Sequence, residues 1–322
     1  MTLDISTVAQ ISQNVLQEID RAVVGKRSVL EKILAAALAG GHVLLEDYPG
    51  LGKTLIARSF ANTLGLNFKR IQFTPDLLPA DITGGYVYNR STSQFDLRQG
   101  PVFTNILLAD EINRASPKTQ SALLEAMQEN QVSLEGETFS LPQPFLVIAT
   151  QNPIEYEGTF PLPEAQLDRF LVKLAVGYPS REEEQEILRR RRQRQVEEVT
   201  LKAVIGEGDL LAMRQAVETV EVHPDLERYI VSLVSESRKD RRVAIGASPR
   251  ASLALLKLAR ARAAIQGRDY ILPDDIKSFV QPVFIHRLLL LPEYWMKQQI
   301  ANEAIESIQR SVPVPVLPVQ PA

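Results

Sequence analysis

Cysteine is absent from this chain of 322 residues, and histidine occurs only three times, as His42, His223 and His286. Without cysteine the protein has no disulfide bond, no catalytic thiol and no zinc or iron–sulfur site built on thiolates. The histidines are far apart and lack the spacing of metal ligands, so we expect each of them to be structural.

Long apolar runs are also missing. The uncharged stretch of residues 33–45 contains Gly40, Gly41 and His42 and is shorter than the roughly 20 apolar residues that cross a bilayer. The first residues show no basic region followed by an apolar core, so we predict no secretory signal. We therefore expect a cytoplasmic protein without a transmembrane segment.

An excess of basic charge is absent as well, because 36 Lys and Arg residues face 39 Asp and Glu residues. The net charge of -3 gives no general attraction to nucleic acid or anionic lipid, so we do not expect a nucleic acid partner. One basic run, residues 189–192 with Arg194, follows Glu186 and precedes residues 197–198, which are both glutamate. This alternation favours a solvated helix with internal ion pairs over a nucleic acid patch.

Short apolar runs rich in leucine and β-branched residues alternate with helical patterns between residues 43 and 174. Uninterrupted apolar strands are typical of a parallel sheet that helices cover on both faces. The predicted strands are residues 42–46, 68–73, 105–110, 145–150 and 171–174. The fold class that this pattern predicts is an α/β nucleotide-binding core.

Two further pairs of short strands bracket turn residues, and we predict hairpins inserted near residues 84–100 and 130–142. After Tyr178 the strand signal ends, and Ser180 with Glu183 forms a capping box that opens a helix. The predicted helices are residues 181–193, 209–220, 224–237, 249–266, 273–279 and 293–310.

Length predicts about two domains, at roughly 150 residues each. We expect a nucleotide-binding core over residues 1–178 and a smaller all-helical domain over residues 179–310. Residues 311–322 carry four prolines and cannot continue a helix. This tail is typical of extended, disordered chain, and the alternative is a docking peptide for a partner groove.

A glycine-rich turn lies between the first predicted strand and a helix that starts near Lys53. Glycines such as Gly50 and Gly52 let backbone N–H groups surround phosphates, the lysine neutralises their charge, and the Thr54 hydroxyl reaches Mg²⁺. Asp47 stands where the phosphate-loop pattern has its first glycine. The pattern therefore predicts a triphosphate site and leaves the backbone conformation at Asp47 as a question.

Polar side chains end two other predicted strands. Asp110 and Glu111 follow an apolar strand, and strand alternation turns neighbouring side chains to opposite sides. We expect Asp110 to hold the water shell of Mg²⁺ and Glu111 to act as the general base on a water. Asn152 ends the next strand with a neutral amide that can hold the attacking water or the γ-phosphate.

Four motifs that occur in this order resemble those of AAA+ ATPases, and the MoxR family is the most similar. The motifs are Pro49-Gly50-Leu51-Gly52-Lys53-Thr54, Asp110-Glu111-Ile112-Asn113-Arg114, Ala149-Thr150-Gln151-Asn152-Pro153 and Glu164-Ala165-Gln166-Leu167-Asp168-Arg169-Phe170. The likeness runs from Val23 to Arg287. It implies a P-loop αβα core with an all-α lid, ATP hydrolysis with Mg²⁺, and a homo-oligomeric ring, usually a hexamer.

The resemblance also implies residue roles. Lys53 and Thr54 are similar to the Walker A pair, and Pro49, Gly50, Leu51 and Gly52 belong to the same phosphate loop. Asp110 and Glu111 are similar to the Walker B pair, and Asn152 is similar to the first sensor. Arg169 resembles an arginine finger that reaches a neighbouring subunit, and Arg250 resembles the second sensor. Val23, Val24 and Gly25 are similar to the adenine pocket, although Lys26 replaces the usual glutamine. Arg114 is a further candidate for a contact between subunits.

Three functional hypotheses follow. The first is a chaperone-like ATPase that remodels a protein client, which the resemblance implies, together with a partner that bears a von Willebrand factor A domain. The second is a nucleotide-gated binding module that switches a partner without turnover. The third, a DNA-acting motor, is disfavoured by the acidic balance of charge.

Overall fold

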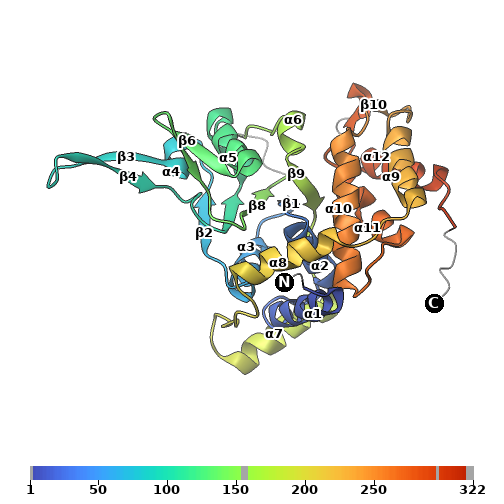
Figure 1. Ribbon diagram of the computed structural model, residues 1–322, viewed down its shortest axis with the longest axis horizontal. Coiled ribbons are helices and arrows are strands. Elements are labelled where there is room, and N and C mark those ends of the chain that lie inside the picture. Colours follow the sequence, from blue (N-terminus) through green and yellow to red (C-terminus); the bar gives the residue numbers. More distant parts are fainter. Residues whose placement is uncertain (1–2, 154–158, 295–296, 317–322) are drawn as a thin grey trace.

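A five-stranded parallel sheet lies at the centre of the protein (Figure 1). The computed structural model describes residues 3–153, 159–294 and 297–316. The strands, in their order across the sheet, are β2 (Phe68–Gln72), β5 (Ile106–Asp110), β8 (Leu146–Gln151), β1 (His42–Glu46) and β9 (Phe170–Leu174). All neighbouring strands are parallel. The predicted α/β class is confirmed, and the five strands start and end within one or two residues of the predicted bounds.

Helices cover both faces of this sheet, which explains why its strands are apolar on both sides. Every residue of β5 is buried. Leu45, Leu108 and Ile148 face the larger apolar cluster, whereas Leu44, Leu107 and Val147 face the smaller one. The helices of this part are α1 (Ile5–Asp20), α2 (Arg27–Leu38), α3 (Lys53–Thr63), α4 (Pro79–Thr83), α5 (Pro117–Glu129) and α6 (Glu164–Leu167). A short 3₁₀ helix, Ile112–Arg114, follows β5.

Both predicted hairpins are present. β3 (Gly84–Asn89) pairs with β4 (Gln94–Gln99), and β6 (Gln131–Leu134) pairs with β7 (Glu137–Ser140), each antiparallel. The first hairpin extends far from the body of the protein (Figure 1). The Tyr86 hydroxyl donates a hydrogen bond of 2.7 Å to Glu137, which joins the two hairpins.

The second half of the chain is mainly helical. Its helices are α7 (Arg181–Arg194), α8 (Glu207–Glu218), α9 (Pro224–Ser237), α10 (Pro249–Ile265), α11 (Pro273–Phe284) and α12 (Gln298–Ser311), with a 3₁₀ turn at Pro292–Tyr294. β10 (Val243–Ile245) and β11 (Leu289–Leu290) form a small antiparallel pair. The expectation of helices alone was wrong at these two strands, which are too short to show alternation. α11 also continues past the predicted end at residue 279 and through Pro282.

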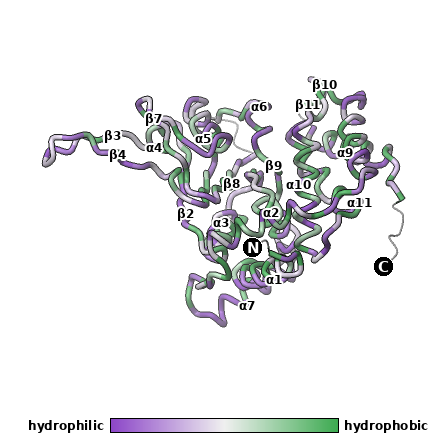
Figure 2. Tube along the Cα trace, viewed as in Figure 1, coloured by the Kyte–Doolittle hydropathy of each residue, from purple (hydrophilic) through white to green (hydrophobic). Residues whose placement is uncertain are grey.

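α7 is the solvated, charged helix that the sequence predicts. None of its residues is buried, and Figure 2 shows it mostly hydrophilic. Glu186 accepts hydrogen bonds from Arg189 at 2.6 Å and from Arg190 at 2.7 Å. Arg190 also donates to the backbone carbonyl of Asp20 at the end of α1. α7 and α8 thus lie beside α1 and α2 rather than with α9 and α12 (Figure 1).

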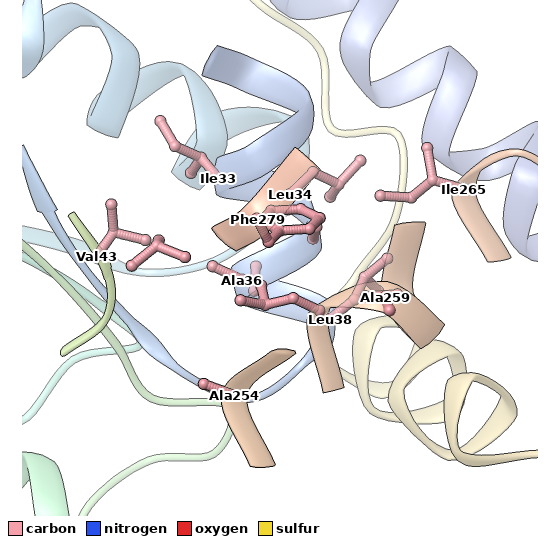
Figure 3. Packing of buried hydrophobic residues seen from close by; sticks show 14 of the residues in the cluster. Ile33, Leu34, Ala36, Leu38, Val43, Ala254, Ala259, Ile265 and Phe279 are labelled. Carbon is pink, nitrogen blue, oxygen red and sulfur yellow. The ribbon is translucent and has the colours of Figure 1, made fainter. Parts of the chain in front are cut away.

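One continuous apolar cluster joins the sheet to the helices of the second half. Figure 3 shows residues of this cluster from both parts, among them Ile33, Leu34 and Ala36 of α2, Val43 of β1 and Phe279 of α11. Alanines of α2 and α10 allow these helices to approach closely; they are Ala35, Ala36, Ala37, Ala251, Ala254 and Ala259. The described helices include none that is both long and apolar enough to cross a membrane.

The end of the chain follows the predicted pattern as far as the structure describes it. α12 ends at Ser311, just before Pro313, and residues 313–316 form no helix or strand. The last part of the predicted tail, residues 317–322, lies outside the described residues, as do residues 1–2, 154–158 and 295–296.

Candidate functional site

The carboxyl ends of β1, β5 and β8 meet at one edge of the sheet and surround a cavity of about 260 Å³. The glycine-rich turn, the acidic pair and the amide, which are far apart in the sequence, all reach this cavity. Its lining residues are Pro49, Gly50, Leu51, Gly52, Lys53, Thr54, Arg70, Asp110, Glu111, Thr150 and Asn152. Most of the predicted site residues are therefore brought together in one place.

The turn between β1 and α3 contains backbone conformations that glycine adopts without strain. Gly50 and Gly52 have φ angles of 81° and 79°, in the left-handed region. α3 begins at Lys53 with Gly52 as its N-cap, so no side chain caps the first N–H groups of the helix. These N–H groups and the helix dipole favour an anion at this position. The Lys53 ammonium donates to the backbone carbonyls of Asp47 and Tyr48, at 2.5 and 3.1 Å.

Asp47 does not need the left-handed conformation that the phosphate-loop pattern suggested, because its φ angle is not positive. The side chain is buried, and its Oδ2 accepts a hydrogen bond of 2.5 Å from the Gly177 N–H. Its Oδ1 accepts another from the Tyr48 N–H at 2.9 Å. The carboxylate that replaces the usual glycine thus anchors the phosphate loop to the segment that follows β9.

Asp110, the last residue of β5, is buried and has a partner on each carboxylate oxygen. The Thr150 hydroxyl donates to Oδ1 at 2.5 Å. The Arg70 guanidinium donates to Oδ2 from Nη2 at 2.7 Å and from Nε at 3.1 Å. Asp110 is therefore oriented by β8 on one side and by β2 on the other.

Glu111 lies one residue beyond β5, so strand alternation does not place its side chain. Its φ of 56° lies in the left-handed region, where a non-glycine residue is strained by roughly 1–3 kcal/mol and which is often found at functional sites. The Glu111 N–H donates to the Thr150 hydroxyl at 2.8 Å. Its carboxylate accepts from Gln72 at 2.6 Å and from Arg114 at 2.9 Å. The Glu111 carboxylate is thus held by one side chain of β2 and by one side chain of the 3₁₀ helix that follows β5.

Asn152 is buried one residue beyond β8 and lines the same cavity. Its neutral amide adds hydrogen-bonding capacity at the edge of the sheet without adding charge.

Arg169 and Arg250 are not brought to this cavity. They line a second cavity of about 270 Å³, together with His42 at the amino end of β1. A five-residue strand spans about 16 Å, so the two cavities lie at opposite ends of the sheet. Within one chain, the predicted arginine finger and second sensor therefore lie together and away from the phosphate loop.

Asp168 and Arg287 organise this second cavity. The Arg287 guanidinium is almost fully buried and donates to Asp168 Oδ1 at 2.7 Å, and Arg250 lies 3.7 Å from Asp168 Oδ2. Burial lowers the pKa of the Arg287 guanidinium, and the ion pair with Asp168 opposes that shift. Because arginine stays charged in proteins, this edge of the sheet presents a fixed cluster of cations.

Val23, Val24 and Gly25, the predicted adenine segment, lie outside the lining of the phosphate cavity. Val23 is buried and Val24 is partly buried. The Glu183 side chain of α7 packs directly over Gly25. Lys26, which replaces the usual glutamine, donates a hydrogen bond of 2.9 Å to the backbone carbonyl of Tyr178. The segment is thus tied to the chain that leads into α7.

The sequence interpretation missed Arg70, Gln72, Thr150 and the pair of Asp168 with Arg287. β2 did carry a signal, since Arg70 and Gln72 alternate with the buried Ile71 and therefore share one face of the sheet. No local signal shows that β2 pairs with β5, which is what places Arg70 opposite Asp110.

Comparisons with known proteins agree with this geometry. The family described as "ATPase family associated with various cellular activities (AAA)" matches residues 42–172, and the AAA lid domain matches residues 235–308. The protein YeaC of Bacillus subtilis is 50% identical over 94% of this chain and 94% of its own length. The chaperone MoxR1 of Mycobacterium tuberculosis is 46% identical over 92% of this chain and 81% of its own length.

Two further similarities extend over nearly the whole chain. The protein MoxR of Methylorubrum extorquens is 31% identical over 93% of this chain and 94% of its own length. A crystal structure of a protein assigned as an ATPase, from Cytophaga hutchinsonii, has a TM-score of 0.89 and 40% identity, and the match covers 96% of each chain. On these similarities and on its own phosphate loop and acidic pair, the chain belongs to the MoxR family of AAA ATPases, which bind and hydrolyse ATP.

Proposed function

We propose that this ATPase forms a homo-oligomeric ring, a hexamer, and hydrolyses ATP with Mg²⁺ at the interfaces between its subunits. It uses the cycle of hydrolysis to remodel a protein client. The observation that carries the proposal is the separation of the two cavities. One end of the sheet gathers the phosphate loop, Asp110, Glu111 and Asn152, and the other gathers Arg169 and Arg250. In a ring, the end of one chain that carries the arginines meets the end of the neighbouring chain that carries the phosphate loop.

The donor set of the first cavity suits a magnesium nucleotide. Asp110 contributes a carboxylate and Thr54 a hydroxyl, and oxygen atoms of these kinds are the ligands that Mg²⁺ prefers. We infer that these two residues hold the ion, which when bound neutralises charge on the phosphates. The N–H groups of residues 50–54 and the Lys53 ammonium hold the phosphate oxygens.

Glu111 is our candidate for the general base. A carboxylate accepts the proton of an attacking water when it lies within hydrogen-bond reach, and Glu111 lines the same cavity as the phosphate loop. Gln72 and Arg114 now hold this carboxylate, so it must exchange one of these partners for the water. We infer that Asn152 orients the same water, and that Val23, Val24 and Gly25 contact the adenine.

Arg169 and Arg250 act on the nucleotide of the neighbouring subunit in this proposal. A rigid cation that meets the charge of the transferring phosphoryl group raises kcat by about 10³- to 10⁵-fold in systems with arginine fingers. Asp168, which the buried Arg287 holds, forms an ion pair that pre-organises Arg250 at the edge of the protein. Hydrolysis then depends on assembly.

The client is a protein in our proposal, because the Mycobacterium tuberculosis relative is named a chaperone. The β3–β4 hairpin supports a contact with the client, since it extends from the body and exposes Val87, Tyr88 and Phe95. A partner with a von Willebrand factor A domain remains part of the proposal. So does the division of the chain into a core (1–178), a helical lid (179–310) and a tail (311–322), although α8 packs against α1 and α2 and Arg190 of α7 donates to the end of α1.

Steady-state ATPase assays across a range of protein concentration test this proposal. Wild-type activity should require Mg²⁺ and should rise as the chain assembles, as measured by light scattering. Glu111→Gln should bind ATP, assemble and lose turnover, and it should retain the client in a pull-down from native extract. A monomer with full activity would contradict the shared site. If Glu111→Gln keeps the biological function, the switch hypothesis replaces remodelling.

A further inference from the structure

Arg70 is the one cation on β2 that reaches the phosphate cavity among the residues that the structure describes. Its guanidinium uses two nitrogen atoms on a single oxygen, Oδ2 of Asp110, at 2.7 and 3.1 Å. The other oxygen of Asp110 accepts from Thr150 at 2.5 Å. Both oxygens of the carboxylate that we assign to Mg²⁺ are therefore engaged within the protein.

The two members of this pair differ in exposure. The Asp110 side chain is 13% exposed, whereas the Arg70 side chain is 47% exposed. A buried carboxylate needs a compensating charge, and Arg70 supplies it at the mouth of the cavity. The more exposed guanidinium can leave for solvent at little cost, since partly exposed ion pairs are weak.

Magnesium and a guanidinium cannot both lie against one carboxylate oxygen without strong repulsion between like charges. We propose that Arg70 is a resident counter-cation of Asp110, which the magnesium of an incoming nucleotide displaces, so that Arg70 sets the magnesium concentration needed for nucleotide binding. The inference rests on the proposed function of the site. It makes Arg70 a positioning residue rather than a catalytic one.

Displacement of Arg70 also reaches Glu111. Arg70 Nη2 donates to the side-chain oxygen of Gln72 at 2.7 Å, and the amide nitrogen of the same Gln72 donates to Glu111 at 2.6 Å. When Arg70 leaves Asp110, Gln72 loses the partner that fixes its amide orientation. Metal binding at Asp110 is thereby linked, through two side chains of one strand, to the contact that holds Glu111.

The test measures binding of a fluorescent, non-hydrolysable ATP analogue while Mg²⁺ is titrated from an EDTA baseline. Arg70→Met should lower the magnesium midpoint about fivefold, which corresponds to about 1 kcal/mol, the upper part of the range for exposed ion pairs. Arg70→Gln should shift the midpoint in the same direction, and Arg70→Lys, which keeps the charge, should stay closer to the wild type.

Lys69→Met is the matched control. It removes one positive charge from the adjacent position of β2, and Lys69 donates to the Gly100 carbonyl rather than to Asp110. Its magnesium midpoint should equal that of the wild type. Thermal unfolding without nucleotide verifies that each variant is folded.

Three results would decide against the inference or against its basis. An unchanged or higher midpoint in both Arg70→Met and Arg70→Gln overturns the inference alone. Weaker analogue binding at saturating Mg²⁺, with an unchanged midpoint, also overturns it and shows that Arg70 contacts the nucleotide instead. Failure of the wild type to bind the analogue at any Mg²⁺ concentration overturns the proposed function itself.

Discussion

Replacement of Arg287 by methionine tests how the second cavity is built. Arg287 follows α11, its side chain is 4% exposed, and it connects this helix to β9. Besides Asp168 it donates to the backbone carbonyls of Val283 at 2.8 Å, Phe170 at 2.7 Å and Leu171 at 3.2 Å. Methionine preserves much of the apolar volume and removes all of these bonds.

The expected loss follows from the groups that are left behind. Removal of one member of a buried ion pair costs about 3–5 kcal/mol, because the other charge stays buried. Asp168 is 21% exposed and keeps Arg250 at 3.7 Å, so we expect about 3 kcal/mol, the lower end of that range. At about 2.1 cal/mol/K per residue, the unfolding entropy of 322 residues is about 0.7 kcal/mol/K, so Tm should fall by about 4 °C.

Thermal unfolding by circular dichroism, combined with the ATPase assay, measures the effect. Arg250→Met is the matched control, because this exposed arginine is a partner of the same carboxylate and should cost less than about 1 kcal/mol in stability. Asp168→Asn in the Arg287→Met background should recover part of the loss, since it removes the uncompensated charge. A Tm for Arg287→Met within 1 °C of that of Arg250→Met would refute this account of the second cavity.

Three further predictions concern the two cavities and the buried His42, which lines the second cavity. Lys53→Ala and Arg169→Ala should each be inactive alone and should regain part of the ATPase activity when mixed, because a mixed ring pairs an intact phosphate loop with an intact arginine. Gln72→Ala should raise basal ATPase severalfold in assays at saturating Mg²⁺ATP, since it removes the hydrogen bond of 2.6 Å that holds Glu111. Burial lowers the pKa of His42 from 6.5 to about 4, so His42 should contribute a loss of about 3 kcal/mol in the free energy of unfolding between pH 7 and pH 4. Denaturant titrations at each pH measure this loss, which should be smaller in His42→Asn.

The sign of the pH effect comes from the neutral tautomer that the fold requires. His42 Nε2 donates to the Met127 carbonyl at 2.9 Å, and its Nδ1 accepts from the Val147 N–H at 3.0 Å. Because the unfolded chain binds a proton below pH 6.5 and the folded chain does not, this stability is complete above pH 6.5 and declines toward pH 4. An identical dependence of the unfolding free energy on pH in wild type and His42→Asn would contradict this assignment of His42.

Failure of the mixed Lys53→Ala and Arg169→Ala variants to recover activity would exclude a shared site.

The sequence was sufficient for those parts of the fold and the site that depend on short segments. The five apolar strands, the turn that contains Gly50 and Gly52, and the acids at the end of β5 each carry a local pattern. The position of each element along the chain, together with the parallel sheet, then predicts that these side chains meet at one edge. The structure agrees with that prediction.

Features that depend on pairing between distant segments of the chain could not be predicted from the sequence. Arg70 faces Asp110 only because β2 pairs with β5, in the register that joins Gln72 to Asp110. Arg250 lies beside Asp168 because α10 packs on α2 through small side chains, and the motif around Arg250 contains nothing of that packing. β10 and β11 are too short for alternation to be visible, and α11 passes through Pro282 because both ends of the helix are fixed by buried contacts.

Calorimetric titration of ATP into the Glu111→Gln protein, with and without Mg²⁺, tests the central claim most directly. If the phosphate loop, Asp110 and Asn152 form one magnesium nucleotide site, each chain should bind one ATP in a magnesium-dependent manner, and Lys53→Ala in the same background should abolish binding. Equal binding with and without the Lys53 side chain, or no binding in either protein, would contradict the claim.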